Sequence, residues 1–169
     1  ISSDYEFKLC RLDVAVKKVV KKFAPQFIGR HISLHIEQIE DSVCTDSKWL
    51  GFIIEQLISN AVKYSKDGGS VRIYTLHGKG DIKKNSKDDS LQLVIEDTGI
   101  GINEEDIPRI MERGFTGYNG RLDRKSSGIG LYLCRKAADR LGFVITFDAS
   151  YKNGTRVVID MTQRYTKHE

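Results

Sequence analysis

The amino-acid sequence predicts a two-layer α/β sandwich, in which about three helices cover one face of a mixed, mostly antiparallel sheet. Two observations indicate this class. Segments with helical spacing of apolar residues alternate with short segments of period two, and several of these strands follow one another directly. The 169 residues fit one domain over residues 1–169, and 40% hydrophobic residues suffice for a core.

The N-terminal part is expected to contain a strand over residues 5–13, a helix capped by Asp13 and a second strand over residues 31–39. Pro25 should end or bend this helix, because proline cannot donate to the helical hydrogen-bond ladder. Residues 42–46 can add a short strand. The apolar face of the helix consists of Val14, Val16, Val19, Val20 and Phe23.

The middle of the chain predicts a long amphipathic helix over residues 47–65, with Asp46 as its cap. Two strands follow, over residues 70–78 and 91–97, and the polar segment 79–89 between them is expected to be a solvated loop. The buried stripe of the long helix consists of Leu50, Ile53, Ile54, Leu57, Ile58 and Ala61.

The remaining elements are a short helix over residues 104–113, a loop over 114–128, a helix over 129–141 and a hairpin over 142–161 that turns at 152–154. Asn103 and Asp106 resemble a capping box at the start of the short helix. Gly142 is the expected stop of the last helix. A glycine-rich loop of 15 residues in a compact domain is usually either a functional lid or disordered, and both alternatives are open for residues 114–128.

Two Gly-Ile-Gly stretches suggest a nucleotide, although neither is a standard phosphate loop. The G-x-G-x-x-G fingerprint fails, because Glu104 and Leu133 stand where the third glycine belongs, and no P-loop is present. The second stretch, at Gly128 and Gly130, opens a helix, and a helix N-terminus attracts anions such as phosphates. The net charge of +4 suits a polyphosphate and does not require nucleic acid.

The first stretch, "DTGIGI", follows a predicted strand and places Asp97 at its end. An ionised carboxylate only accepts hydrogen bonds, so Asp97 suits an exocyclic amine such as that of adenine. Gly99 and Gly101 would let the backbone approach a flat base, because they carry no Cβ.

The long helix adds a polar face to this site. Gln56, Asn60 and Tyr64 follow at intervals of four residues and therefore share one side of the helix. Mg²⁺ prefers oxygen ligands, so the amide oxygen of Asn60 is the expected metal ligand, and Lys63 could approach a phosphate. Cys10, Cys44 and Cys134 have no metal-binding spacing and are expected to be reduced core thiols.

Taken together, these motifs resemble the GHKL ATPase superfamily, in particular the catalytic ATP-binding domain of bacterial sensor histidine kinases. "QLISNAVKYS" resembles the N box, "DTGIGI" the G1 box, "RGFTG" the F box, "SSGIGLYL" the G2 box and "NGTRVVI" the final Gly-Thr strand. The lid and G2 segments are most similar to the kinases that sense bacitracin and other antimicrobial peptides in Gram-positive bacteria.

The resemblance implies the Bergerat form of the α/β sandwich and a site for ATP and Mg²⁺. Asn60 would ligate Mg²⁺, Asp97 would bind the adenine amine with help from Thr155, and Phe115 would be the aromatic residue of the lid. The full nucleotide site would contain Asn60, Lys63, Tyr64, Asp97, Gly99, Gly101, Ile102, Phe115, Thr116, Ser127, Gly128, Ile129, Gly130, Leu131 and Thr155, with Gln56 as a second candidate for the metal.

Two departures from the family pattern matter. Many relatives carry asparagine where this chain has Gln56, so the geometry of any second metal contact is open. The base-like glutamate of the ATP-hydrolysing relatives would also stand at that position, so Glu55 does not match it and a kinase is favoured.

The resemblance also implies partners outside the chain. None of His31, His35, His77 and His168 lies in a phosphoacceptor pattern, and none is placed for a metal site; His31 and His35 are expected on a strand. We therefore expect an upstream dimerisation and phosphoacceptor domain, a membrane sensor, a response regulator and a peptide-exporting ABC transporter, with the catalytic domain in the cytoplasm. Without the acceptor, the chain should bind nucleotide but not autophosphorylate. A serine kinase of the anti-sigma type and a catalytically silent scaffold remain alternatives.

Overall fold

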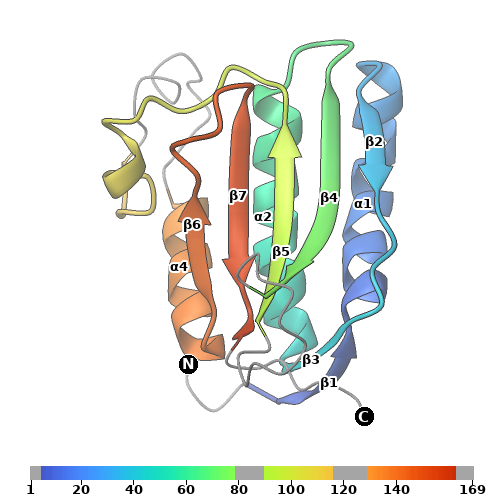
Figure 1. Cartoon of the computed structure of the whole chain (residues 1–169), viewed down its shortest axis with the longest axis vertical. Coiled ribbons are helices and arrows are strands. Elements are labelled where there is room, and N and C mark those ends of the chain that lie inside the picture. Colours follow the sequence, from blue (N-terminus) through green and yellow to red (C-terminus); the bar gives the residue numbers. More distant parts are fainter. Residues whose placement is uncertain (1–4, 79–89, 116–128, 163–169) are drawn as a thin grey trace.

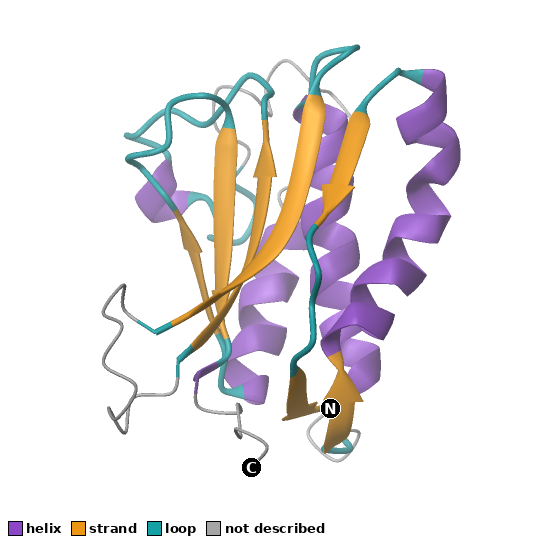
Figure 2. Cartoon of the chain, turned by 45° about the vertical axis from the view of Figure 1, so that its right-hand side comes forward, coloured by secondary structure: helices purple, strands orange, loops and turns teal. Residues whose placement is uncertain are grey.

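The computed structural model describes residues 5–78, 90–115 and 129–162. Within these ranges, three α-helices lie side by side on one face of a five-stranded sheet (Figure 1). Figure 2 shows the opposite face of the sheet without a helix over it. The elements are β1 (Lys8–Arg11), α1 (Leu12–Gly29), β2 (Ser33–Ile36), β3 (Ser42–Thr45), α2 (Ser47–Tyr64), β4 (Ser70–His77), β5 (Leu91–Asp97), the 3₁₀ helix η2 (Ile107–Arg109), α4 (Gly130–Leu141), β6 (Val144–Phe147) and β7 (Thr155–Asp160).

The main sheet is mixed and mostly antiparallel, as the sequence predicts. Its strand order is β2-β4-β5-β7-β6, in which β2 and β4 are parallel and all other neighbours are antiparallel. Contrary to the expectation of one sheet, β1 and β3 form a separate antiparallel pair. After β2 the chain leaves the main sheet and buries Ile39 in the core, which brings β3 beside β1 at the start of α2.

The helix α2 confirms its predicted cap and its predicted buried stripe. Asp46 accepts a hydrogen bond from the backbone N–H of Trp49 at 3.0 Å through Oδ1, which satisfies one of the unpaired donors of the first turn. All six predicted stripe residues are buried, and Val62 joins them. Together with the inward side chains of the sheet, this stripe forms the core of the domain.

The N-terminal elements differ from their predicted bounds. The first strand covers only Lys8–Arg11, and α1 starts at Leu12, so Asp13 lies in the first turn and not at the cap. Leu12 is fully buried and its N–H is bonded to the carbonyl of Asp41, which fixes the helix start two residues early. The helix continues past Pro25 to Gly29, because Phe27 on its last turn is anchored in the core.

The second strand, β2, is also shorter than predicted. It starts at Ser33, and His31 precedes it in a turn with a φ of 54°, so only His35 of the two histidines lies on the strand. After Ile36, the backbone N–H of Glu37 still bonds to Ile73, and the chain then departs from β4.

The segment after β5 contains one 3₁₀ turn where a longer α-helix is predicted. The N–H of Asp106 bonds to the carbonyl of Asn103, and that of Ile110 to the carbonyl of Ile107, which are three-residue spacings. Pro108 lacks the N–H that an α-helix would need there. The predicted capping box is thus replaced by backbone turns.

The C-terminal elements agree with their predictions. The helix α4 ends at Leu141, and Gly142 follows with a φ of 78°, the left-handed conformation that commonly stops a helix. The hairpin of β6 and β7 is antiparallel. The predicted solvated loop at 79–89 and all of the predicted lid from residue 116 onward lie outside the described residues.

The three cysteines are free, as expected, but they are not all in the core. Cys134 is fully buried, and burial raises the pKa of its thiol to about 12. Cys10 and Cys44 lie half-buried on the small sheet. None of the helices in the described ranges is long and apolar enough to cross a membrane.

Candidate functional site

Asp97 ends β5 on the face of the sheet that carries the helices. It is 5% exposed, and its Oδ1 accepts hydrogen bonds from the backbone N–H of Gly99 at 2.9 Å and of Thr155 at 3.3 Å. Burial raises the pKa of Asp97 to about 6, although these two hydrogen bonds lower it. A carboxylate is thus held in a fixed direction at a strand end, where its charge is poorly solvated.

The glycines of this turn are needed for packing against protein backbone. A Cβ on Gly99 would lie 2.1 Å from the carbonyl oxygen of Tyr64, and the same oxygen accepts the N–H of Ile100 at 3.1 Å. Gly101 has a φ of 75°, and a Cβ there would lie 3.1 Å from the carbonyl oxygen of Gly154. The absence of a Cβ is thus already required by the close approach of α2 and of the β6–β7 hairpin, and room for a flat base at these two positions stays a prediction.

The polar face of α2 lies as predicted. Gln56, Asn60 and Tyr64 are half-buried, whereas the opposite stripe is fully buried. The ammonium of Lys63 is exposed and lies 5.3 Å from the centre of the Tyr64 ring. Through the contact of Tyr64 with residues 99–100, the end of α2 lies directly beside the turn that follows Asp97.

The start of α4 packs against the polar face of α2. A Cβ on Gly130 would lie 2.5 Å from Oε1 of Gln56, so the first residue of α4 packs directly on this amide. Leu131 is half-buried against the core, and Ile129 is largely exposed. The structure thus brings the N box and the G2 box together, while Thr116, Ser127 and Gly128 lie outside the described residues.

Phe115, the predicted aromatic residue of the lid, is the last residue described before the predicted lid. Its N–H bonds to Glu112 at 3.2 Å, and the guanidinium of Arg109 lies 4.6 Å from the centre of its ring. Its ring is therefore held by a cation–π contact with the 3₁₀ segment.

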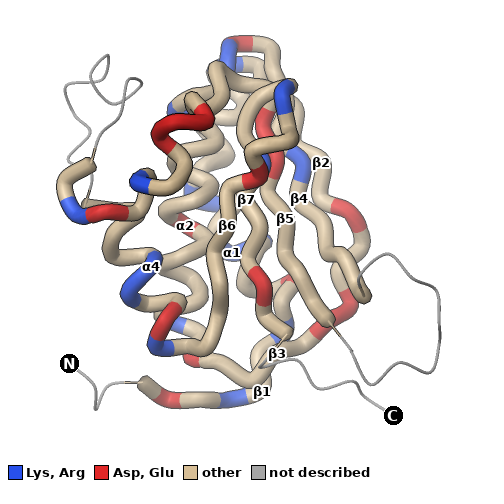
Figure 3. Tube along the Cα trace, turned by 60° about the vertical axis from the view of Figure 1, so that its left-hand side comes forward, with Lys and Arg blue, Asp and Glu red and all other residues tan. Residues whose placement is uncertain are grey.

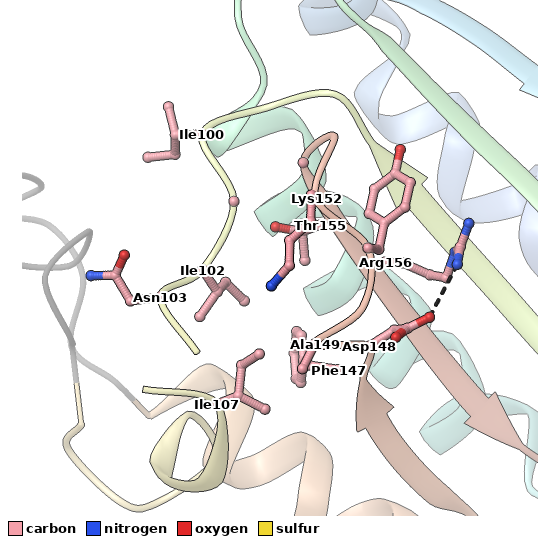
Figure 4. A pocket seen from close by; sticks show the side chains of 13 residues that line it. Ile100, Ile102, Asn103, Ile107, Phe147, Asp148, Ala149, Lys152, Thr155 and Arg156 are labelled. Carbon is pink, nitrogen blue, oxygen red and sulfur yellow. Dashed lines mark hydrogen bonds and ion pairs between the residues drawn. The ribbon is translucent and has the colours of Figure 1, made fainter. Parts of the chain in front are cut away.

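A pocket of about 130 Å³ lies between the turn at residues 100–103 and the β6–β7 hairpin (Figure 4), and Asp97 is not among the residues that line it. Three predicted site residues line it, Gly101, Ile102 and Thr155. Lys152 of the hairpin pairs with Glu104, which ties the two walls together. The remaining walls of the pocket are formed mainly by Ile107, Phe147, Asp148, Tyr151 and Arg156. The sequence did not indicate these residues, because the packing of the hairpin against the turn is a tertiary contact.

Comparison with known proteins identifies the family. The family described as histidine kinase-, DNA gyrase B-, and HSP90-like ATPase matches residues 45–164. The chain belongs to this family. It is 35% identical over 155 residues to the sensor protein BceS of Bacillus subtilis (strain 168), covering 92% of this chain and 43% of BceS. It is 38% identical over 120 residues to the sensor protein kinase GraS of Staphylococcus aureus (strain JH1), covering 71% of this chain and 32% of GraS.

Solved structures show that the fold is that of histidine kinase catalytic domains. The mycobacterial sensor histidine kinase MprB aligns with a TM-score of 0.73 at 22% identity, covering 96% of this chain and 99% of that chain. The catalytic domain of histidine kinase ThkA aligns with a TM-score of 0.74 at 19% identity, covering 93% of this chain and 95% of that chain.

As a member of this ATPase family, the chain binds ATP. BceS is named as a sensor protein and GraS as a sensor protein kinase, so a serine kinase of the anti-sigma type and a silent scaffold are not favoured. The chain spans less than half the length of these relatives, 43% of BceS and 32% of GraS.

Proposed function

We propose that this domain binds Mg-ATP between the polar face of α2, the turn after β5 and the start of α4, and donates the γ-phosphate to a histidine on a separate domain. The observation that supports this most directly is the setting of Asp97. Among the described residues, both hydrogen bonds to this carboxylate reach Oδ1, which leaves Oδ2 to accept the adenine amine. Thr155, on the neighbouring strand, would share in this recognition through its hydroxyl.

The residues on α2 suit a magnesium ion held mainly by the nucleotide. No group of three or more His, Cys, Asp or Glu side chains that could hold a metal ion occurs within the described ranges, so a carboxylate cage is not available there. Asn60 and Gln56 offer amide oxygens on one helix face, and Mg²⁺ accepts such ligands together with phosphate oxygens and water. Gln56 is held against Gly130, so its oxygen lies at the start of α4, where the phosphates would lie. The bound ion would neutralise charge on the transferred phosphoryl group.

The remaining site residues would surround the nucleotide. Tyr64 and Ile102 would line the base, and Lys63 would approach a phosphate from the end of α2. The backbone at Gly128, Ile129, Gly130 and Leu131 would face the triphosphate, with Phe115, Thr116 and Ser127 in the lid. Phosphoryl transfer depends chiefly on such positioning and charge neutralisation, so the protein needs no covalent intermediate.

The phosphoacceptor is proposed to lie on another domain. His77 is paired with Asp41 at 2.7 Å and stands opposite Leu91, at the other end of the sheet from Asp97. Six residues of β-strand separate these two levels, which is about 20 Å. His31 and His35 are exposed near β2, the edge strand farthest from the hairpin. The names of the relatives as sensor proteins support an upstream dimerisation and phosphoacceptor domain.

For the full-length protein, we propose a membrane-bound sensor with this domain in the cytoplasm, a response regulator as the receiver of the phosphoryl group, and a role in the response to antimicrobial peptides beside a peptide-exporting ABC transporter. The similarity to BceS and GraS, together with the lid and G2 sequences, supports this assignment.

The test is nucleotide binding followed by phosphotransfer. The chain should bind ATP more tightly with Mg²⁺ than without it, and Asp97→Ala should abolish binding while the circular dichroism spectrum stays unchanged. Glu6→Ala, which removes an exposed carboxylate beside the start of α2, at the opposite end of this helix from Tyr64, is the control. Unchanged ATP affinity in Asp97→Ala would disprove the adenine assignment. With the acceptor domain added, the product should be an acid-labile phosphohistidine; an acid-stable phosphoserine on a partner would favour the serine-kinase alternative.

A further inference from the structure

A row of charged side chains crosses the helix-free face of the main sheet, directly behind the candidate site. The strand register aligns Arg72 of β4, Glu96 of β5 and Arg156 of β7. Asp148 continues the row after β6, and its N–H donates to the carbonyl of Arg156 at 2.9 Å. In Figure 3, basic and acidic stretches alternate across these strands.

The centre of this row is a largely buried ion pair. The Nε of Arg156 lies 2.8 Å from Oε1 of Glu96, and a second guanidinium nitrogen lies 3.0 Å from Oδ2 of Asp148. The hydroxyl of Tyr74 donates to the same oxygen of Glu96, and the ring of Tyr151 lies 4.4 Å from the Arg156 guanidinium. Glu96 and Tyr74 are each 8% exposed. A carboxylate this buried depends on its partners, so the pair resists separation.

This ion pair is one residue away from the two residues that would recognise adenine. Glu96 precedes Asp97 on β5, and Arg156 follows Thr155 on β7. Side chains alternate along a strand, so the ion pair lies on one face while Asp97 and Thr155 lie on the other. In the register of β5 and β7, Glu96 stands opposite Arg156 and Asp97 stands opposite Thr155. The backbone N–H of Thr155 donates to the carboxylate of Asp97 at 3.3 Å, which is a long hydrogen bond.

The β5–β7 ladder ends at this level, where Thr155 stands opposite Asp97. Thr155 is the first residue of β7, and Gly154 before it has a φ of 151°, with the position of its absent Cβ only 1.9 Å from the carbonyl oxygen of Asp97. A small shift of β7 along or away from β5 would therefore move Thr155 relative to Asp97 and change the direction of the carboxylate.

We propose that Glu96 and Arg156 are positioning residues of the nucleotide site, which act from the opposite face of the sheet by fixing the spacing of Asp97 and Thr155. This inference rests on the proposed function, because it assigns the pair a role in adenine recognition. It predicts that loss of the pair reduces discrimination for the base more than it reduces affinity for nucleotides in general.

The experiment compares ATP with inosine triphosphate, which carries a carbonyl oxygen in place of the adenine amine. Dissociation constants of both are measured for the parent chain and for Arg156→Gln. Because this change leaves the buried Glu96 without its cationic partner, the double variant E96Q/R156Q removes both charges and keeps an acceptor for Tyr74. Arg72→Gln is the matched control, since Arg72 lies in the same row and contacts the ring of Tyr74 at 4.4 Å, but forms its ion pair with the half-exposed Glu37. Arg156→Lys tests rescue by a retained charge.

The expected result is a preference for ATP over inosine triphosphate in the parent chain that falls about tenfold in both Arg156→Gln variants, the factor of one misdirected hydrogen bond. Arg72→Gln should keep the parent preference, and Arg156→Lys should recover part of it. If ATP and inosine triphosphate bind equally more weakly to the variants, the ion pair has a merely structural role. An unchanged preference for ATP despite a lower melting temperature would show the same. If the parent chain itself shows no preference for ATP over inosine triphosphate, the proposed recognition of adenine by Asp97 is wrong, and the inference that rests on it is wrong as well.

Discussion

The buried carboxylate of Asp97 gives a prediction with a definite sign and size. Burial raises its pKa to about 6 from an ordinary value of 3.8. Well below pH 3.8 the group is protonated in the folded and the unfolded chain, and ionisation then contributes no difference in stability. As the pH rises from 3.8 to about 6, the unfolded chain ionises first while the folded chain keeps its proton, so the stability falls. Above pH 7 the full cost is present, and it corresponds to about 3 kcal/mol of lost stability.

Asp97→Asn should therefore stabilise the nucleotide-free domain while it abolishes ATP binding. Asparagine keeps an oxygen that can accept from Gly99 and Thr155 but carries no charge. At pH 8 the melting temperature should rise by about 6–12 °C, given the usual 2–4 °C per kcal/mol for a domain of this size. The gain should stay nearly constant down to about pH 7, shrink between about pH 6 and pH 4, and vanish at lower pH. Thermal unfolding followed by circular dichroism between pH 4 and 8 measures it.

Asp46→Asn is the control, because Asp46 is equally buried but has the opposite electrostatics. It is 4% exposed, and although burial would raise its pKa, hydrogen bonds from the backbone N–H groups of Glu6 and Trp49 lower it below the ordinary value. Its ionised form stabilises the fold above the unfolded pKa, so Asp46→Asn should lower the melting temperature at pH 8, by less in acid. If Asp97→Asn is destabilising at pH 8, or its effect is constant from pH 4 to 7, the reasoning about Asp97 is refuted.

Three further predictions follow from the same geometry. Gly99→Ala should destabilise the domain by more than about 2 kcal/mol, since its Cβ would collide with the Tyr64 carbonyl. Gly51→Ala, at an open position of α2, should stabilise the domain by about 0.5–1 kcal/mol. Chemical denaturation measures both changes, and an unchanged stability in Gly99→Ala would contradict this close packing. The buried thiol of Cys134, with a pKa of about 12, should react with iodoacetamide only after unfolding. Modified Cys134 found by mass spectrometry after treatment of the native chain would contradict this prediction. The preference for ATP over inosine triphosphate should decline below pH 6 as Asp97 becomes protonated, and a preference that is constant down to pH 5 would argue against a carboxylate reading the base.

Periodicity along the sequence was sufficient to predict most of the fold. The stripe of α2 and the turn at Gly142 were predicted correctly, because each depends on local spacing or on one residue with a special conformation. The bounds of α1 and β2 were wrong. They depend on the burial of Leu12 and Phe27 and on where β2 leaves β4, which are long-range contacts that no local pattern records.

The candidate site was predicted only in part, because some of its contacts are also long-range. Asp97 and the polar face of α2 could be found from motifs, since their chemistry is carried by single residues. The packing contacts of the glycines could not, because the carbonyls that lie against Gly99 and Gly101 come from α2 and from the β6–β7 hairpin. The ion pair of Glu96 and Arg156 was also missed, because these residues are 60 positions apart and meet only through the sheet register.

The small sheet of β1 and β3 has a mechanical consequence. The incoming chain is fastened at the start of α2, where the N–H of Glu6 bonds to Asp46 at 2.7 Å and the ring of Tyr5 stacks on Trp49 at 5.3 Å. The 18 residues of α2 then form a rod of about 27 Å whose far end lies against the turn after Asp97. A displacement of the N-terminal segment would thus be passed directly to α2, the helix that carries Asn60 on its polar face.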